Sequence, residues 1–161
     1  MTDADSRDDA HEELFAVAYL SRVRRPMTVA EVDRLVIEAN AHNAMQGVTG
    51  ALLYDGQQFF QYFEGPAAGV ERIYERIKHS SKHAIVSEVF NGPVPRRYFS
   101  QWHMASKKAG SETLLELGTA RWLQVKSGMQ ARFAESEGVR RLVAFWGEGG
   151  PVLPLTPVAP A

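Results

Sequence analysis

Three polar side chains able to form hydrogen bonds stand at positions where the sequence pattern calls for apolar residues. Gln61 alternates with Phe59 and Phe63 in QFFQYFEGP, so a strand there carries the amide on an apolar face. Tyr19 interrupts a strand-like apolar run in the same way, and Asn43 extends an apolar helical stripe. Each needs a partner when buried, because an unmet donor or acceptor costs about 1–3 kcal/mol.

These three residues allow two interpretations. In the structural one, a buried tyrosine bonds to a nearby amide and Asn43 caps the end of its helix, and the pattern alone favours this interpretation. In the functional one, both strand faces point towards the same pair of helices. Tyr19, Gln61 and Asn43 then converge beneath those helices and share a common partner.

Other chemistry-bearing residues give weaker signals. Arg76 and Ser80 share one stripe of a second helix, so Arg76 would border a groove where its guanidinium binds a carbonyl or phosphate; a solvated surface arginine is the alternative. His79 and His83 have the spacing of a metal-binding pair on a helix, but no third ligand accompanies them. With no Gly-rich phosphate loop and no nucleophile elbow, the sequence predicts neither a metal site nor a self-contained catalytic centre.

The bulk composition restricts the class of protein. The 161 residues suggest one domain, and the net charge of −1 does not favour binding to nucleic acid or to anionic membranes. The absence of cysteine excludes thiol catalysis, disulfides and thiolate metal sites. No apolar run approaches the roughly 20 residues of a membrane span, and the polar N-terminus is not a signal peptide, so we expect a cytoplasmic protein.

The periodicity of apolar residues predicts the elements that position these side chains. The predicted strands span residues 14–20, 48–54, 57–64, 85–90 and 101–105. The first helix starts at a capping box formed by Thr28 and Glu31, and the second has Pro66 in its first turn. Asp55-Gly56 predicts a type I′ hairpin turn, and Gly92-Pro93 is expected to break the chain after the fourth strand.

This order predicts an α+β fold, a ferredoxin-like β-α-β-β-α-β-β sheet with two helices on one face. The other face of the sheet is also apolar, because Leu14, Leu20, Phe60 and Tyr62 point towards it. Something must therefore cover that face as well. Helices from the C-terminal part of the chain and a second subunit are the two candidates.

The C-terminal part of the chain favours the helical cover. Leucines and aromatic residues recur at helical intervals through residues 112–146, which predicts two helices separated near Gly128 or Gly138. We therefore predict a disordered N-terminus, a ligand-binding domain, a helical cover and a flexible Pro-rich tail, at residues 1–13, 14–106, 107–147 and 148–161.

Three separated stretches resemble the BLUF family, blue-light sensors that bind a flavin noncovalently. They are AYLSR at residues 18–22, AHNAMQGVTGALLYDGQQFFQYFEGP at 41–66 and RRYFSQWHM at 96–104. They occur in the family's order and spacing and cover about residues 14–106. The middle stretch is highly specific. The resemblance implies the same fold, with the flavin ring between the two helices.

Carried over residue by residue, the resemblance implies roles for the polar side chains. The family's photoactive tyrosine falls on Tyr19, its switching glutamine on Gln61 and its flavin-ring asparagine on Asn43. Ser80 departs from the aspartate that several members carry there. The usual cofactor is FAD, with FMN as the alternative. The other implied positions are His42, Arg76 and Ser80 for cofactor binding, and Trp102 and Met104 on the fifth strand for signal relay.

The resemblance also implies a mechanism. Tyr19 passes an electron and then a proton, the latter through Gln61, whose amide can donate at one end and accept at the other. The rearranged amide shifts the flavin absorption to the red, and the fifth strand relays the change to the C-terminal helices. We expect a short BLUF protein with no catalytic domain after residue 106, which signals through a partner protein or its own oligomer.

Two alternatives come from other proteins of the same fold. Phe59, Phe60 and Tyr62 are reminiscent of the stacking platform of an RNA-binding module, although the charge does not support it. The stretch SRVRR at residues 21–25 faintly resembles the phosphate loop of an acylphosphatase. It lacks the glycines such a loop needs, so we interpret it as a solvated basic loop.

Overall fold

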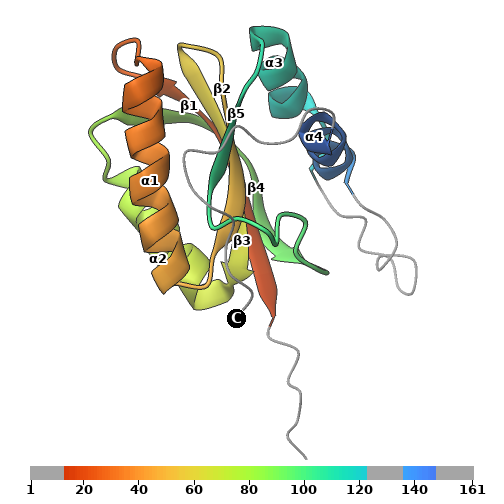
Figure 1. Cartoon of the computed structure of the whole chain (residues 1–161). Coiled ribbons are helices and arrows are strands. Elements are labelled where there is room, and N and C mark those ends of the chain that lie inside the picture. The colour runs from red at the N-terminus through yellow and green to blue at the C-terminus, as the bar shows by residue number, and fades with distance from the viewer. Residues whose placement is uncertain (1–12, 123–135, 148–161) are drawn as a thin grey trace, which may run out of the picture.

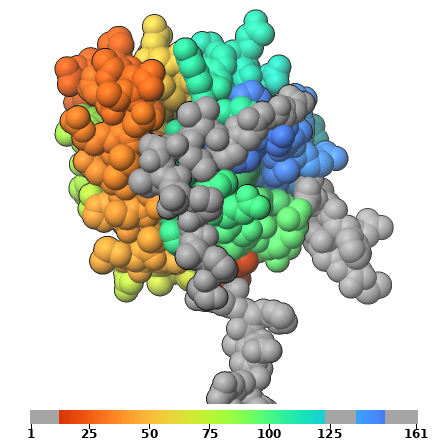
Figure 2. Space-filling model, viewed as in Figure 1, coloured from red at the N-terminus to blue at the C-terminus, as the bar shows by residue number. Residues whose placement is uncertain are grey.

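The computed structural model of this chain describes residues 13–122 and 136–147. A five-stranded sheet lies at its centre, with α1 and α2 on one face and α3 and α4 on the other (Figure 1). In the space-filling view, α1 lies at one side of the surface and α3 and α4 at the opposite side (Figure 2). In chain order the elements are β1 Leu14–Val23, α1 Val29–Met45, β2 Thr49–Tyr54, β3 Gln58–Pro66, α2 Ala67–Lys78, β4 His83–Val94, β5 Ala105–Lys108, α3 Ser111–Thr119 and α4 Glu137–Gly147.

The sheet has the strand order β4-β1-β3-β2-β5. Strand β1 pairs antiparallel with β3 and β4, β2 pairs antiparallel with β3, and β5 runs parallel to β2. In this register Tyr19 lies directly opposite Gln61. The predicted ferredoxin-like α+β class, with an added fifth strand, is confirmed.

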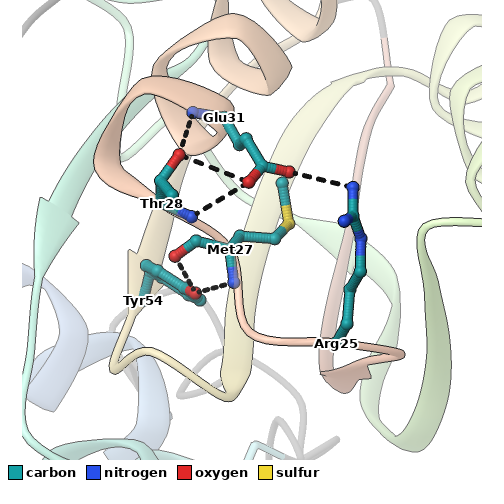
Figure 3. A network of polar contacts seen from close by, with 5 residues as sticks. All are labelled: Arg25, Met27, Thr28, Glu31 and Tyr54. Carbon is teal, nitrogen blue, oxygen red and sulfur yellow. Dashed lines mark hydrogen bonds and ion pairs between the residues drawn. The ribbon is translucent and has the colours of Figure 1, made fainter.

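Helix α1 begins at the predicted capping box (Figure 3). The Glu31 backbone N–H donates to Thr28 Oγ1 at 3.1 Å, and the Thr28 N–H donates back to Glu31 Oε1 at 3.4 Å. Just before the cap, the Tyr54 hydroxyl accepts from the Met27 N–H at 3.1 Å and lies 2.9 Å from the Met27 carbonyl oxygen. These contacts fix the start of α1 to the end of β2.

The hairpin between β2 and β3 forms as predicted, but its turn is not type I′. That turn needs a positive φ at both central residues, whereas Gly56 has one (110°) and Asp55 does not. Instead, Asp55 Oδ1 accepts from the backbone N–H of Gln57 at 2.8 Å and of Gln58 at 2.7 Å. Burial opposes ionisation, but these bonds outweigh it and lower the pKa of Asp55.

Several predicted boundaries were wrong. Strand β1 runs to Val23, so the expected basic loop is in part a strand. Strand β4 continues through Gly92-Pro93, because it lies at the edge of the sheet and a proline there needs no second ladder partner. Pro66 is the N-cap of α2 rather than a residue of its first turn. Strand β5 starts at Ala105, so Trp102 and Met104 precede it.

The two faces of the sheet have separate apolar cores. The face away from α1 and α2 includes Phe60 and Tyr62, whose rings stack on Trp122 at centroid distances of 5.5 and 6.2 Å. Both side chains are fully buried, which removes the support for an RNA-stacking platform. The buried apolar side chains that α3 and α4 contribute are Leu114, Leu117, Val139, Leu142 and Trp146.

The predicted cover by two C-terminal helices is therefore confirmed, with a different boundary. Gly138 does not separate the helices, because it is the second residue of α4. The alternative break at Gly128 and the expected disorder at both chain ends lie outside the described residues. No helix in the described ranges combines the length and apolarity that crossing a membrane requires.

Candidate functional site

A cavity of about 630 Å³ lies between α1 and α2, against the face of the sheet that those helices cover. Its apolar lining includes Val36 of α1, Leu52 of β2 and Ile73 of α2. Every site residue expected from the sequence lines it except Trp102. Those residues are Tyr19, His42, Asn43, Gln61, Arg76, Ser80 and Met104.

The cavity floor holds a hydrogen bond between neighbouring strands. The Tyr19 hydroxyl donates to Gln61 Oε1, and the two side chains are 1% and 6% exposed. Burial is the main cause that raises the pKa of Tyr19, so the phenol stays protonated. At its other end, Gln61 Nε2 has the thioether of Met104, at 3.9 Å, as its one partner among the described residues. The amide N–H is therefore weakly bonded and next to the cavity.

Asn43 has a different role from the simple helix cap that the pattern also allowed. Its side chain is 2% exposed and its Nδ2 donates to the His103 carbonyl oxygen at 2.7 Å. One turn earlier, Asn40 Nδ2 donates to the Met104 carbonyl oxygen at 2.9 Å. The two amides hold the segment before β5 against α1. Asn40 was not predicted from the sequence, because its partner is a backbone carbonyl that no residue type reveals.

Met104 and Trp102 lie on different sides of the sheet. Met104 is 1% exposed and lines the cavity beside Gln61. Trp102 is half-buried and packs against the core that α3 and α4 cover. The resemblance placed both on the fifth strand, where residues two apart share a face of the sheet. The chain is irregular there, so the two-residue alternation does not apply.

Arg76 and Ser80 stand at the α2 side of the cavity, together with His79. Arg76 and His79 are exposed and Ser80 is half-buried. At the rim, Lys82 Nζ, in the connection between α2 and β4, forms an ion pair with Glu38 Oε2 of α1 at 3.2 Å. The rim carries charges of both signs, since Arg76 and Lys82 stand there with Glu38 and Glu75, while the floor is buried and neutral.

His83, the first residue of β4, is a cavity residue that the sequence analysis did not assign to the site. Its ring stacks near Tyr19, with centroids 6.1 Å apart and planes at 16°. Burial lowers the pKa of His83, which favours the neutral imidazole. Its Nδ1 is buried and has no hydrogen-bond partner within the described ranges. The described residues contain no group of three or more potential metal ligands, so His83 does not belong to a metal site there.

Comparison with known proteins identifies the family. The BLUF model, described as sensors of blue-light using FAD, matches residues 14–105. A Euglena gracilis protein named photoactivated adenylate cyclase subunit beta is 34% identical over 94 residues, which cover 58% of this chain and 11% of the relative. The blue light- and temperature-regulated antirepressor BluF of Escherichia coli (strain K12) is 34% identical over 88 residues, which cover 55% of this chain and 22% of the relative. The chain thus spans a small part of these relatives.

Solved structures give the same result. The dark-state structure of BlrB, a BLUF protein, has a TM-score of 0.62 at 27% identity and covers 83% of this chain and 98% of its own. The BlrP1 BLUF structure has a TM-score of 0.56 at 28% identity and covers 89% of this chain and 97% of its own. On the match of the family model and these likenesses, the chain belongs to the BLUF family of blue-light sensors that use a flavin.

Proposed function

We propose that the cavity between α1 and α2 binds FAD, and that Tyr19 and Gln61 turn the absorption of blue light into a rearranged hydrogen bond. The residues present fit a planar ring with polar edges. Ile73 and Leu52 supply apolar lining, while His83 Nδ1 and Gln61 Nε2 are polar groups that have no strong partner within residues 13–122 and 136–147. FAD is preferred over FMN because the family is described as using FAD. Arg76, at the rim, is placed to meet a ligand carbonyl or phosphate.

The bond between Tyr19 and Gln61 carries this proposal. When bound, an oxidised flavin excited by blue light supplies a one-electron oxidant. Tyr19 gives up an electron and its hydroxyl proton moves along the existing hydrogen bond to Gln61. The amide then rotates or tautomerises, which costs little at its other end because a thioether is a weak acceptor. When the electron and the proton return to Tyr19, the rearranged Gln61 is left with a stronger hydrogen bond to the ring, which would shift the absorption of the oxidised flavin to the red.

The output path we propose runs from Gln61 through Met104 into β5 and on to α4. Met104 directly precedes β5, and Lys107 of β5 donates from Nζ to the Phe145 carbonyl oxygen of α4 at 2.9 Å. A change at Gln61 that moves Met104 would thus reach a C-terminal helix by covalent and hydrogen-bonded steps. The helices then pass the signal to a partner protein or to a second copy of the chain, without catalysis by this domain.

The substitution Gln61→Leu tests the switch. We expect the variant to bind flavin and to lose the light-induced red shift, because leucine can neither accept the Tyr19 proton nor bond to the ring. Gln58→Leu is the matched control, since Gln58 lies on the same strand and does not line the cavity. Visible spectra in the dark and after blue illumination give the answer. A full red shift in Gln61→Leu would move the switch to another residue.

A further inference from the structure

Tyr19 stacks on a second tyrosine that lies behind it as seen from the cavity. The ring of Tyr74, on α2, has its centroid 6.1 Å from that of Tyr19, with the planes at 22°. Tyr74 is 5% exposed, and the residues that line the cavity include Tyr19 but not Tyr74. An electron from Tyr74 therefore reaches the cavity most directly through Tyr19.

The two phenols differ in the base that accepts their hydrogen bond. The Tyr74 hydroxyl donates to Glu88 Oε2 at 2.5 Å, whereas the Tyr19 hydroxyl donates to the neutral amide oxygen of Gln61. Glu88 is exposed and is the register partner of Tyr19 on the edge strand β4, so the sheet itself brings the carboxylate next to Tyr74 of α2. Burial and then the bond to Glu88 raise the pKa of Tyr74, so this phenol also stays protonated in the ground state.

The difference in base decides which phenol is easier to oxidise. A phenol that loses an electron becomes a strong acid, and a carboxylate takes up its proton far more readily than an amide oxygen does. Lys78 Nζ lies 4.3 Å from the centroid of Tyr74 and would oppose a positively charged ring. Because the proton leaves for Glu88, the ring stays neutral and Lys78 does not oppose the overall step.

We propose that Tyr74 is a second electron donor, which reduces oxidised Tyr19 and passes its own proton to Glu88. This inference rests on the proposed function, which supplies the oxidised Tyr19. One electron moves from Tyr74 to Tyr19, the O–H bond of Tyr74 breaks and an O–H bond forms on the Glu88 carboxylate. The proton that Tyr19 gave to Gln61 returns along their hydrogen bond, and Tyr19 is restored. The result is a neutral tyrosyl radical on Tyr74 beside a protonated Glu88, one ring further from the cavity. Charge recombination reverses each step.

Time-resolved absorption of the flavin-loaded full chain tests this step. We expect Tyr74→Phe and Glu88→Gln each to shorten the lifetime of the neutral tyrosyl radical severalfold. Both substitutions keep the size and shape of the side chain. Glu71→Gln, at an exposed position of α2, is the control for loss of a negative charge and should match the parent. Time-resolved infrared should show a transient carboxylic acid band in the parent that both variants lack. Parent-like lifetimes in both variants would overturn the proposal.

A second readout needs no flavin. In the flavin-free protein labelled with ¹³C at the tyrosine ζ carbon, the resonance missing from Tyr74→Phe identifies Tyr74. The pKa of Tyr74 should be lower in Glu88→Gln than in the parent, because the neighbouring negative charge is gone. An unchanged ionisation would show that the pair does not form in solution and would overturn the proposal.

The two proposals fail in different ways. If Tyr19→Phe still yields the radical, the proposed function is wrong. If the radical requires Tyr19 but its lifetime is independent of Tyr74 and Glu88, only the second donor is wrong.

Discussion

Two asparagines of α1 make the same kind of bond to the same segment but face different surroundings. Asn43 donates to the His103 carbonyl at 2.7 Å and lines the cavity. Asn40 donates to the Met104 carbonyl at 2.9 Å and is not among the lining residues. The comparison of these two residues separates ligand binding from the anchoring of the segment.

We expect Asn43→Ala to weaken flavin binding and Asn40→Ala to leave it nearly unchanged. Both variants should lower the free energy of unfolding of the flavin-free protein by about 1–3 kcal/mol, because each leaves a backbone carbonyl without its donor. Fluorescence titration of flavin into the flavin-free variants and urea unfolding measure the two effects. Equal losses of flavin affinity would show that Asn43 acts only by holding the segment.

The convergence of Tyr19, Gln61 and Asn43 was predictable because strand alternation and helical spacing each fix a face. The place of His83 was not, because it was considered only as half of a metal-binding pair with His79 that lacked a third ligand. It is in fact the first residue of an edge strand whose length the sequence underestimates. A residue type and its spacing reveal neither the stack on Tyr19 nor the lack of a partner for Nδ1 in the part of the chain that the structure describes.

At the scale of elements, the contact between Trp122 and the start of α4 fixes how the C-terminal helices cover the sheet. Trp122 Nε1 donates to the Leu117 carbonyl of α3 at 2.8 Å, and its ring stacks on Phe60. The same indole meets Gly138, where an added Cβ would come within 2.1 Å of a ring carbon. The fit leaves no space for a larger residue at position 138.

Gly138→Ala is therefore expected to destabilise the fold by about 1–3 kcal/mol, through overpacking against Trp122. Gly147→Ala is the matched control, because it lies at the other end of α4 and its added Cβ would meet no atom within 4 Å. Urea unfolding followed by tryptophan fluorescence compares the two. Equal stabilities for both variants would contradict the close packing of α4 on Trp122.

The elements themselves were predicted in type and order but less well in extent. The prediction ended the fourth strand at Phe90, whereas β4 continues to Val94. Gly92-Pro93 would end a central strand, because proline cannot donate a hydrogen bond to a neighbouring strand, but an edge strand tolerates it. The fifth strand was predicted to start too early. Trp102 and Met104 have the two-residue spacing of a strand, but β5 begins only at Ala105. These errors lie in edge strands, whose limits depend on neighbours rather than on their own pattern.

At the scale of the whole molecule, Glu64 joins the sheet to the connection that leads towards β5. It is fully buried and accepts hydrogen bonds from the backbone N–H of Tyr98 at 2.6 Å and Phe99 at 2.7 Å, and from the Tyr62 hydroxyl at 2.7 Å. The Phe99 ring meets that of Trp146 on α4 edge-on, at 5.8 Å. The Glu64 carboxyl thus holds the connection between β4 and β5 against the sheet, and Phe99 of that connection contacts α4.

This arrangement predicts a pH dependence of stability. Burial, only partly offset by the hydrogen bonds, raises the pKa of Glu64 from 4.5 to about 6. The folded state therefore binds the proton more tightly than the unfolded state. The associated stability is fully present below pH 4.5 and is lost as the pH rises through 6, a decrease of about 2 kcal/mol.

Urea unfolding across this pH range, in the parent and in Glu64→Gln, isolates the effect. Glutamine keeps an acceptor oxygen but does not titrate, so the variant should lack the decrease that the parent shows between pH 4.5 and 6. The same pH dependence in both proteins would contradict a raised pKa for Glu64.

The central claim is that light oxidises Tyr19 and that Gln61 records the event. Its most direct test is the visible spectrum of purified Tyr19→Phe beside that of the parent, each in the dark and just after blue illumination. We predict flavin bands in both proteins in the dark, a small red shift that recovers in the dark for the parent, and no shift for the variant. A normal, reversible red shift in Tyr19→Phe would contradict the account.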